Sequence, residues 1–277
     1  MRGEPLIARL ALGMRRPRNR VLGGDVAGVI AKVGPGVTAF EAGDEVFGVG
    51  KGTFAELAVV PVKKLVRLPE GVSFEQAAAV PISGITALHA VRNVGGVQPG
   101  QSVLVIGAAG GVGTYAVQIA KADGGVVTGV CSTAKLDLVR SLGADHVVDY
   151  TSDDILELGQ RYDVVIDIAG NRTLRQMRRV LTPKGTLVIV GGEEGGRWVG
   201  GIQRNLWAAL WSPFIGQRLR AFVSRERGED IETMAQMVAA GTVTPVVERT
   251  FPLAEAADAI RHLESGRVRG KVVVTVG

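Results

Sequence analysis

A glycine-rich turn between a strand and a helix constrains this sequence more than any other feature. The β-branched run Val103–Ile106 is followed by Gly107-Ala-Ala-Gly-Gly-Val-Gly113 and then by the helical stretch Thr114–Ala122. Glycine lets the backbone turn sharply and lie close to a pyrophosphate, whose charge then meets the amides at the start of the helix. The turn therefore predicts a dinucleotide-binding α/β domain, although a tight turn without a ligand would fit the spacing alone.

From Ser102 onward, short apolar runs alternate with helical stretches, which is typical of βαβ units around a parallel sheet. The expected strands are Val103–Ile106, Val126–Val130, His146–Val148, Val164–Ile168, Leu187–Val190 and Leu219–Val223. The expected helices are Thr114–Ala122, Ala134–Leu142, Ile155–Leu158 and Leu174–Leu181. Strands this apolar are buried on both faces, so we predict a Rossmann doubly wound parallel sheet.

The chain has a different pattern on either side of this region. Short runs punctuated by Gly and Pro predict strands at Asp25–Val33, Glu45–Val49 and Phe54–Val60. The C-terminal part predicts helix Ile231–Ala240, strand Val246–Phe251, helix Ala254–Glu264 and strand Lys271–Val276. We expect residues 87–228 to form the dinucleotide-binding domain, and residues 1–86 to form a second domain that segment 229–277 rejoins.

The end of the second expected strand indicates which dinucleotide is bound. A domain that prefers NAD usually carries Asp or Glu about 20 residues beyond the turn, where it binds the ribose. No acid occurs between Val126 and Lys135, whereas Ser132, Thr133 and Lys135 offer hydroxyls and a positive charge that suit a 2′-phosphate. The alternative is that Ser132 and Thr133 only cap the helix that holds Lys135. The residues favour NADPH.

Metal chemistry is poorly supported by the composition. Cys131 is the only cysteine, and His89, His146 and His262 are the only histidines, in unrelated contexts. Cys₄ and Cys₂His zinc sites are therefore impossible within one chain, and we expect no metal site.

Charge and hydropathy point to a small-molecule partner. The net charge is +5, and the basic residues are spread along the chain except for Arg15, Arg16, Arg18 and Arg20, which we interpret as a solvated loop rather than an RNA-binding or targeting element. No apolar run approaches the roughly 18 residues of a membrane span. We expect a cytoplasmic protein with neither a nucleic-acid nor a membrane partner.

Two other families that use a glycine-rich turn fit less well. A short-chain reductase needs a Lys four positions after a Tyr, but the residues four after Tyr115, Tyr150 and Tyr162 are Ile119, Asp154 and Ile166. A methyltransferase would not explain Ser132 and Lys135.

The sequence resembles a zinc-independent medium-chain dehydrogenase/reductase of the quinone oxidoreductase group over essentially its whole length. Besides the glycine turn, the motifs are Gly24-Asp25-Val-Ala-Gly28 with Gly34, Gly43-Asp44-Glu-Val-Phe-Gly48, Val80-Pro81-Ile-Ser-Gly84-Ile-Thr86-Ala87, Gly143-Ala144-Asp145-His146 to Asp149-Tyr150, and Arg269-Gly-Lys-Val-Val-Val. The resemblance implies a GroES-like, mostly-β catalytic domain beside the Rossmann domain, and a homodimer joined through the edge of the Rossmann sheet.

The resemblance also implies which residues surround the cofactor. Thr86, Gly191 and Phe222 would lie near the nicotinamide, Gly110, Gly111 and Val112 would hold the pyrophosphate, Ser132, Lys135 and Tyr150 would surround the 2′-phosphate, and Arg267 to Arg269 would approach from the C-terminal segment. Structural alternatives remain open: Tyr150 as a strand-end packing residue, Phe222 as a core residue and Arg269 as a solvated charge.

Zinc members of the family carry a His-Glu pair where this sequence has Gly24-Asp25. Without a Lewis-acid metal, hydride transfer suits a conjugated carbonyl, because attack at the β-carbon spreads charge into an enolate. The sequence therefore predicts an NADPH-dependent oxidoreductase that reduces quinones or other α,β-unsaturated carbonyls, and it identifies no catalytic residue. A non-catalytic NADPH-binding protein is the alternative.

Two segments depart from the family pattern. Met1-Arg-Gly-Glu-Pro resembles an internal loop, so we expect the GroES-like domain to be incomplete at its N-terminus, with an exposed sheet edge. Segment Glu193–Arg220 is a long insertion containing Trp198, Trp207, Trp211 and Phe214. A substrate lid and packing in the core or at a subunit interface both remain open for it.

Overall fold

The structure is a computed structural model that describes residues 21–190, 208 and 215–277. These residues fold into two compact units, one running from Thr86 to Ser224 and the other joining the residues up to Ile85 to Arg225–Gly277. The arginine cluster at 15–20, Gly191 and the aromatic residues of the insertion lie outside the described residues.

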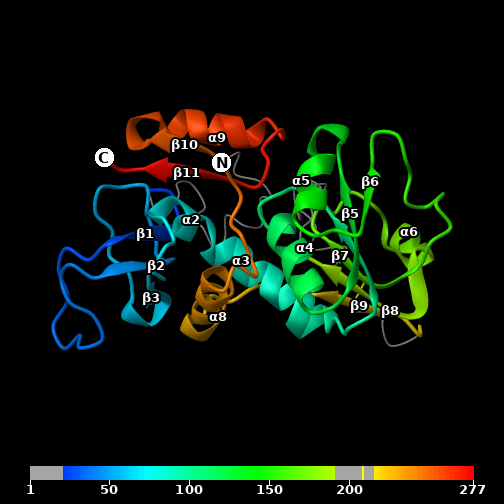
Figure 1. Ribbon diagram of the computed structural model, residues 1–277, viewed down its shortest axis with the longest axis horizontal. Helices are drawn as coiled ribbons and strands as arrows, with labels where there is room; N and C mark the ends of the chain where they lie inside the picture. Colours follow the sequence, from blue (N-terminus) through cyan, green and yellow to red (C-terminus); the bar gives the residue numbers. More distant parts are fainter. Residues whose placement is uncertain (1–20, 191–207, 209–214) are drawn as a thin grey trace, which may run out of the picture. The chain divides into compact units, whose positions relative to one another are not determined.

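The first unit contains a six-stranded parallel sheet with the strand order β6-β5-β4-β7-β8-β9 (Figure 1). Its strands are β4 (Ser102–Ile106), β5 (Val126–Cys131), β6 (His146–Asp149), β7 (Tyr162–Asp167), β8 (Leu181–Ile189) and β9 (Arg218–Ala221). The chain starts in the middle of the sheet, winds outward to β6, and then returns to β7 and winds to β9. This order reverses direction at β4 and confirms the predicted doubly wound Rossmann fold.

The helices of this unit fill the crossovers between parallel strands. They are α4 (Gly113–Ala122), α5 (Leu136–Ser141), α6 (Leu174–Arg179) and the 3₁₀ turn η3 (Thr133–Lys135), while α3 (Pro81–Leu88) and the π-helix η2 (His89–Gly95) precede the sheet. Helix α6 begins with a capping box, in which Thr173 and Gln176 each accept a hydrogen bond from the other's backbone amide. Helix α4 is buried from Gly113 to Ala120, so it lies in the core of the unit.

The core of the sheet explains why its strands were visible in the sequence. Leu104, Val165 and Leu187, from three adjacent strands, are fully buried. Apolar side chains on both faces of a covered sheet produce continuous β-branched runs, which local patterning detects.

One helix expected in this unit is wrong. Residues 155–158 form a turn, because the Asp154 carboxylate accepts the Leu156 amide at 2.9 Å and the Asp154 carbonyl accepts the Glu157 amide at 2.9 Å. A short Asp side chain that bonds nearby amides competes with helix formation.

The second unit combines two small sheets with helices, as a GroES-like fold requires. Its elements are β1 (Asp25–Val29), β2 (Glu45–Val49) and β3 (Leu65–Arg67) in an antiparallel sheet, β10 (Val247–Pro252) and β11 (Lys271–Thr275) in a parallel pair, helices α2 (Phe74–Ala79), α8 (Gly228–Ala239) and α9 (Ala256–Glu264), and 3₁₀ turns η1 (Val62–Lys64) and η5 (Leu253–Glu255). Within the part of the chain that the structure describes, no helix is both long and apolar enough to cross a membrane.

The strand expected at Phe54–Val60 is wrong, and β3 was not anticipated. Segment 54–60 is irregular, and Leu57 and Val59 are 78% and 94% exposed. The alternation of apolar residues suggested a strand, but a strand needs a neighbouring strand to accept its hydrogen bonds, which local sequence cannot reveal.

A partly buried ion pair joins the two parts of the second unit. Asp25 at the start of β1 accepts hydrogen bonds from the Ile82 amide at 2.8 Å and from Lys271 Nζ at 3.4 Å, and Lys271 also donates to Ser83 Oγ at 2.9 Å. Burial raises the pKa of the Asp25 carboxyl, while the charge of Lys271 opposes that rise. The pair therefore fixes β11 of the C-terminal segment against β1 and the start of α3.

The substitution Lys271→Met should lower the free energy of unfolding at neutral pH by about 1–3 kcal/mol, because it leaves a largely desolvated carboxylate without its cation. It also removes an influence that lowers the pKa of Asp25. The pKa of Asp25 in the folded state then rises further above its value in the unfolded state. The loss of stability should therefore grow as the pH rises toward the folded-state pKa of Asp25, be complete above it, and shrink in acid. Denaturant unfolding across a pH series measures this.

The matched control is the double variant Asp25→Asn/Lys271→Met, in which no charge remains to be buried. It should be more stable than Lys271→Met at neutral pH and should lose the pH dependence. An equal loss at every pH, unchanged by Asp25→Asn, would contradict an electrostatic role for the pair.

Candidate functional site

The glycine turn follows β4 at the carboxyl edge of the sheet, where the strand order reverses. Gly107 has a φ of +86°, and the amides of Gly107 and Ala108 both donate to the Val130 carbonyl, at 3.2 and 3.0 Å. The Gly110 amide donates to the Gly107 carbonyl at 3.1 Å. These bonds attach the turn to the end of β5 and direct the following residues into α4.

Gly113 is required by a close approach of the backbone to itself. A Cβ atom on residue 113 would lie 2.0 Å from the Gly107 carbonyl oxygen and 2.8 Å from the Ala108 Cα atom. On Gly110, by contrast, a Cβ would lie 3.4 Å from that oxygen, which is ordinary contact. The backbone of the turn therefore requires glycine at position 113. At position 110 it does not, and the missing side chain leaves space beside the turn.

The start of α4 offers hydrogen-bond donors that the protein does not use. No side chain caps the helix at Val112. Among the described residues, the Gly111 and Val112 amides have no backbone acceptor, whereas the Thr114 amide donates to Gly110 at 3.0 Å. Unused amides and the positive end of the helix dipole together form a binding site for an anion.

Two hydroxyl residues follow β5, and the structure separates their roles. Ser132 precedes η3 but its side chain makes no capping hydrogen bond. Thr133 Oγ1 donates to the Asp149 carboxylate and lies 2.9 Å from Thr151 Oγ1. The capping alternative is therefore wrong for Ser132. The Thr133 hydroxyl is used in its hydrogen bond to the Asp149 carboxylate.

Asp149, at the end of β6, is an acid at this edge that the sequence analysis did not weigh. Its carboxylate accepts hydrogen bonds from Thr133 Oγ1, and from the Thr151 amide and hydroxyl at 2.9 and 2.7 Å. These hydroxyl donors hold the pKa of Asp149 below its usual range. The carboxylate is charged and already occupied by protein donors, which differs from an acid that faces a ribose.

Tyr150 follows Asp149 at the end of β6, next to the hydrogen-bonded side chains of Thr133, Asp149 and Thr151. Its amide donates to the Cys131 carbonyl at 3.0 Å, and its residue is 60% exposed. Exposure of this extent does not fit the alternative that Tyr150 packs at the strand end. Cys131 itself is buried, which raises the pKa of its thiol to about 11, so it stays protonated at neutral pH.

Of the residues expected near the nicotinamide, the structure describes Thr86 and Phe222. Thr86 is half-buried near the end of α3, and Phe222 is half-buried rather than part of the core. The Phe222 ring meets the His89 ring edge-on at 6.4 Å, and His89 Nδ1 lies 3.3 Å from Ser224 Oγ. His89 and Ser224 were missed because neither belongs to a recognisable motif.

Arg267 and Arg269 belong to the second unit. They precede β11 and are both exposed, while the intervening Val268 is buried. Gly191 lies outside the described residues. Of the predicted cofactor-binding residues, the structure thus brings Gly110, Gly111, Val112, Ser132, Lys135 and Tyr150 to the ends of three adjacent strands.

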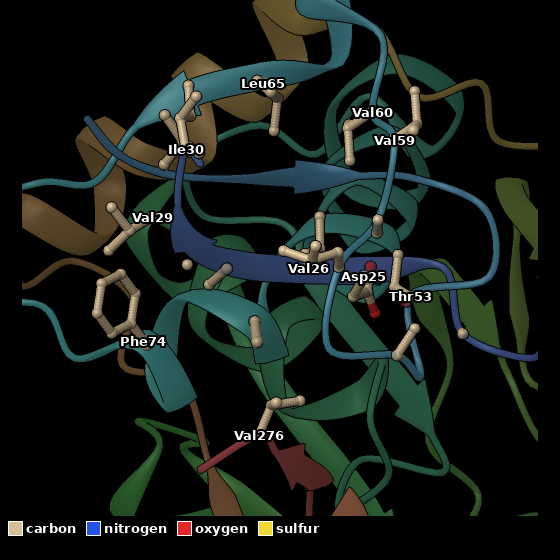
Figure 2. A pocket seen from close by; sticks show the side chains of 18 of the residues that line it. Asp25, Val26, Val29, Ile30, Thr53, Val59, Val60, Leu65, Phe74 and Val276 are labelled. Atoms are coloured by element: carbon tan, nitrogen blue, oxygen red, sulfur yellow. The ribbon is translucent and has the colours of Figure 1, made fainter. Parts of the chain in front are cut away.

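The second unit contains a cavity of about 990 Å³. Figure 2 shows its lining: Val29, Ile30 and Phe74 lie on one side, Thr53 and Val59 on the other, and Val276 at the bottom of the view. The strands β1 and β11 that border it each pair with one other strand among the described residues. The apolar lining and this size suit a small apolar molecule or an extended chain segment.

Within residues 21–190, 208 and 215–277, no group of three or more His, Cys, Asp or Glu side chains could hold a metal ion.

Comparisons with known proteins identify both parts of the chain. Residues 6–70 match the alcohol dehydrogenase GroES-like domain, and residues 142–274 match the family described as zinc-binding dehydrogenase. The mitochondrial NAD(P)H oxidoreductase RTN4IP1 of Mus musculus is 33% identical over 287 residues, covering 92% of this chain and 70% of that protein. The chloroplast envelope quinone oxidoreductase homolog of Arabidopsis thaliana is 33% identical, covering 90% of this chain and 78% of that protein.

A solved structure agrees with these relatives. The quinone oxidoreductase from Coxiella burnetii superposes with a TM-score of 0.84 at 29% identity, covering 98% of this chain and 83% of that one. The polyketide synthase GfsB of Streptomyces halstedii is 36% identical over 274 residues, but the chain spans only 5% of that protein's length.

The substitution Gly113→Ala should lower the free energy of unfolding by about 1–3 kcal/mol, because its Cβ would overlap the Gly107 carbonyl oxygen. Gly110→Ala should cost less than about 1 kcal/mol, since it meets that oxygen at ordinary contact distance. Denaturant unfolding of the two variants beside the wild type measures the difference. Equal destabilisation would show that the close approach at residue 113 is not what the turn requires.

Proposed function

The chain belongs to the medium-chain dehydrogenase/reductase family, in its quinone oxidoreductase-like group, and from that premise we propose that it reduces quinones or other α,β-unsaturated carbonyls with NADPH. It is an oxidoreductase with a nicotinamide cofactor. The identity of the cofactor, the substrate and the independence from zinc are the proposed parts.

The observation that carries the proposal is the pair of unused amides at the start of α4. Gly111 and Val112 would donate to the pyrophosphate, and the absence of a side chain at Gly110 would let it approach. When bound, a nicotinamide cofactor supplies the hydride. The protein supplies binding and orientation, and the groups proposed near the nicotinamide are Thr86, Gly191 and the Phe222 ring beside His89. Arg267 and Arg269 are proposed to approach the cofactor from the C-terminal segment.

NADPH is proposed over NADH because of the residues after β5 and β6. Ser132 has a hydroxyl that does not cap η3, Lys135 brings a positive charge, and Tyr150 is exposed beside them. The nearby acid, Asp149, accepts hydrogen bonds from Thr133 and Thr151 instead. Hydroxyl and ammonium donors recognise a phosphate, whereas an NAD site would present a carboxylate to the ribose.

A catalytic zinc does not fit this chain. Where zinc members of the family carry His-Glu, Asp25 follows Gly24, and its carboxylate is bonded to the Lys271 ammonium and the Ile82 amide. A carboxylate neutralised by an internal lysine is a poor metal ligand. We therefore propose zinc-independent chemistry.

Quinones and enones are the proposed substrates for a chemical reason and a comparative one. Hydride addition to the β-carbon of a conjugated carbonyl delocalises the negative charge, so modest hydrogen bonding can stabilise it. The relatives reported above include proteins named quinone oxidoreductases. We propose a cytoplasmic homodimer joined at the outer edge of β9, which pairs only with β8 among the described residues.

Mixing the protein with NADPH and a panel of quinones and enones should give oxidation of NADPH that depends on both substrate and enzyme concentration. A panel without turnover, combined with tight NADPH binding by calorimetry, would contradict the reductase and support the alternative, a non-catalytic NADPH-binding protein.

The substitution Lys135→Ala should weaken NADPH binding by about 10–100-fold, because one charge-assisted bond to the 2′-phosphate contributes about 1.5–3 kcal/mol. NADH binding should change less than about twofold. Calorimetric titration of both cofactors measures the selectivity. The matched control is Lys184→Ala, an exposed lysine near the start of β8; equal losses for NADPH and NADH would refute the phosphate assignment.

A further inference from the structure

Four arginines form a depression at the edge of the Rossmann sheet opposite the glycine turn. Arg161 immediately precedes β7, while Arg175, Arg178 and Arg179 lie on α6. Together with Pro183, Gly216 and Gln217 they line a cavity of about 410 Å³, which we call the arginine pocket. Because β7 and β9 begin here, the pocket lies at the amino edge of the sheet, whereas the turn lies at the carboxyl edge.

One guanidinium of the pocket is held in place. Arg178 Nε donates to Gln217 Oε1 at 2.9 Å, and the Gln217 amide nitrogen donates in return to the Arg178 and Thr182 carbonyls, at 3.0 and 3.2 Å. Gln217 thereby links the end of α6 to the start of β9 and fixes the base of the pocket. Within the part of the chain that the structure describes, Arg178 bonds through Nε, so its two terminal nitrogens can donate to a ligand.

The other three arginines are exposed and have no carboxylate partner in the pocket. The lining contains no acid. Among the described residues, no ion pair involves Arg161, Arg175 or Arg179, and the nearby Asp154 pairs with Arg172 at 3.0 Å, outside the pocket. Arg179 acts on Asp154 only at a distance, as a weak influence that lowers its pKa.

This arrangement opposes the local stability of α6. Arg175 has Arg178 and Arg179 three and four positions away, so like charges share one face of a six-residue helix. Pairs of like charges at these spacings destabilise a helix. Concentrating uncompensated cations around a hollow is unfavourable without a ligand and becomes favourable when an anion neutralises them.

We propose that the arginine pocket binds a small oligoanion that carries two or more phosphate groups. Guanidinium groups bind phosphate oxygens through paired parallel hydrogen bonds, and four of them exceed what one phosphate needs. The pocket is a shallow, open depression whose four guanidinium groups come from two neighbouring chain segments, so they converge on a compact ligand. The site requires neither the cofactor nor the reductase activity.

Calorimetric titration with inorganic pyrophosphate, at constant ionic strength, tests the proposal. The test variant is Arg175→Gln/Arg179→Gln, which removes two exposed charges and should weaken pyrophosphate binding at least tenfold. The control is Arg140→Gln/Arg225→Gln, which removes the same charge from exposed positions elsewhere and should change binding less than twofold. Arg161→Gln, outside α6, should weaken binding in the same direction.

Pyrophosphate could also occupy the glycine turn, so each titration is repeated with saturating NADPH and with Lys135→Ala. The proposal expects binding that survives both conditions. Loss of binding in either condition, equal weakening by the two double variants, or equally tight binding of sulfate or of an acidic peptide would overturn it. Failure of NADPH to bind would count against the proposed function alone, because the arginine variants still report on this pocket.

Discussion

The carbonyl oxygen of Gly107 occupies the space that a side chain on residue 113 would need, at 2.0 Å from the position of its Cβ. This close approach lets the chain leave β4, turn within a few residues and begin α4 without a capping side chain. The first two amides of the turn, those of Gly107 and Ala108, donate to the Val130 carbonyl at the end of β5. Among the described residues, the Gly111 and Val112 amides have no backbone acceptor. They lie where the strand order reverses, which is where open α/β sheets bind their ligands.

The two edges of the same sheet use different chemistry for negative charge. The carboxyl edge presents backbone amides and a helix dipole, which suit a buried pyrophosphate and require glycine. The amino edge presents arginine side chains around a fixed Arg178–Gln217 pair, which suits a more exposed anion. In the second unit, the negative charge of Asp25 is neutralised by Lys271 of the same unit.

Sequence patterns predicted the Rossmann sheet well because its strands are buried on both faces, as at Leu104 and Val165. They failed where structure depends on distant or polar partners. Residues 155–158 satisfied a helical spacing, but the Asp154 side chain bonds the Leu156 amide and makes a turn. The Asp25–Lys271 pair spans 246 positions in sequence, so no local pattern reveals it. Ser132 and Lys135 were predicted from their spacing after the glycine turn, and Tyr150 from the family resemblance, and all three remain predictions. The hydrogen bond between Thr133 and Asp149 depends on the pairing of β5 with β6, which local sequence does not reveal.

The central claim is that this chain transfers a hydride from NADPH to a conjugated carbonyl. The most direct measurement uses NADPH deuterated at the transferable position of the nicotinamide, with an enone as substrate and mass and NMR analysis of the product. If this chain transfers a hydride from NADPH, we expect one deuterium on the β-carbon of the reduced enone for each cofactor oxidised. Deuterium absent from that carbon while NADPH is consumed, or NADPH left intact in the presence of enone and quinone alike, would contradict it.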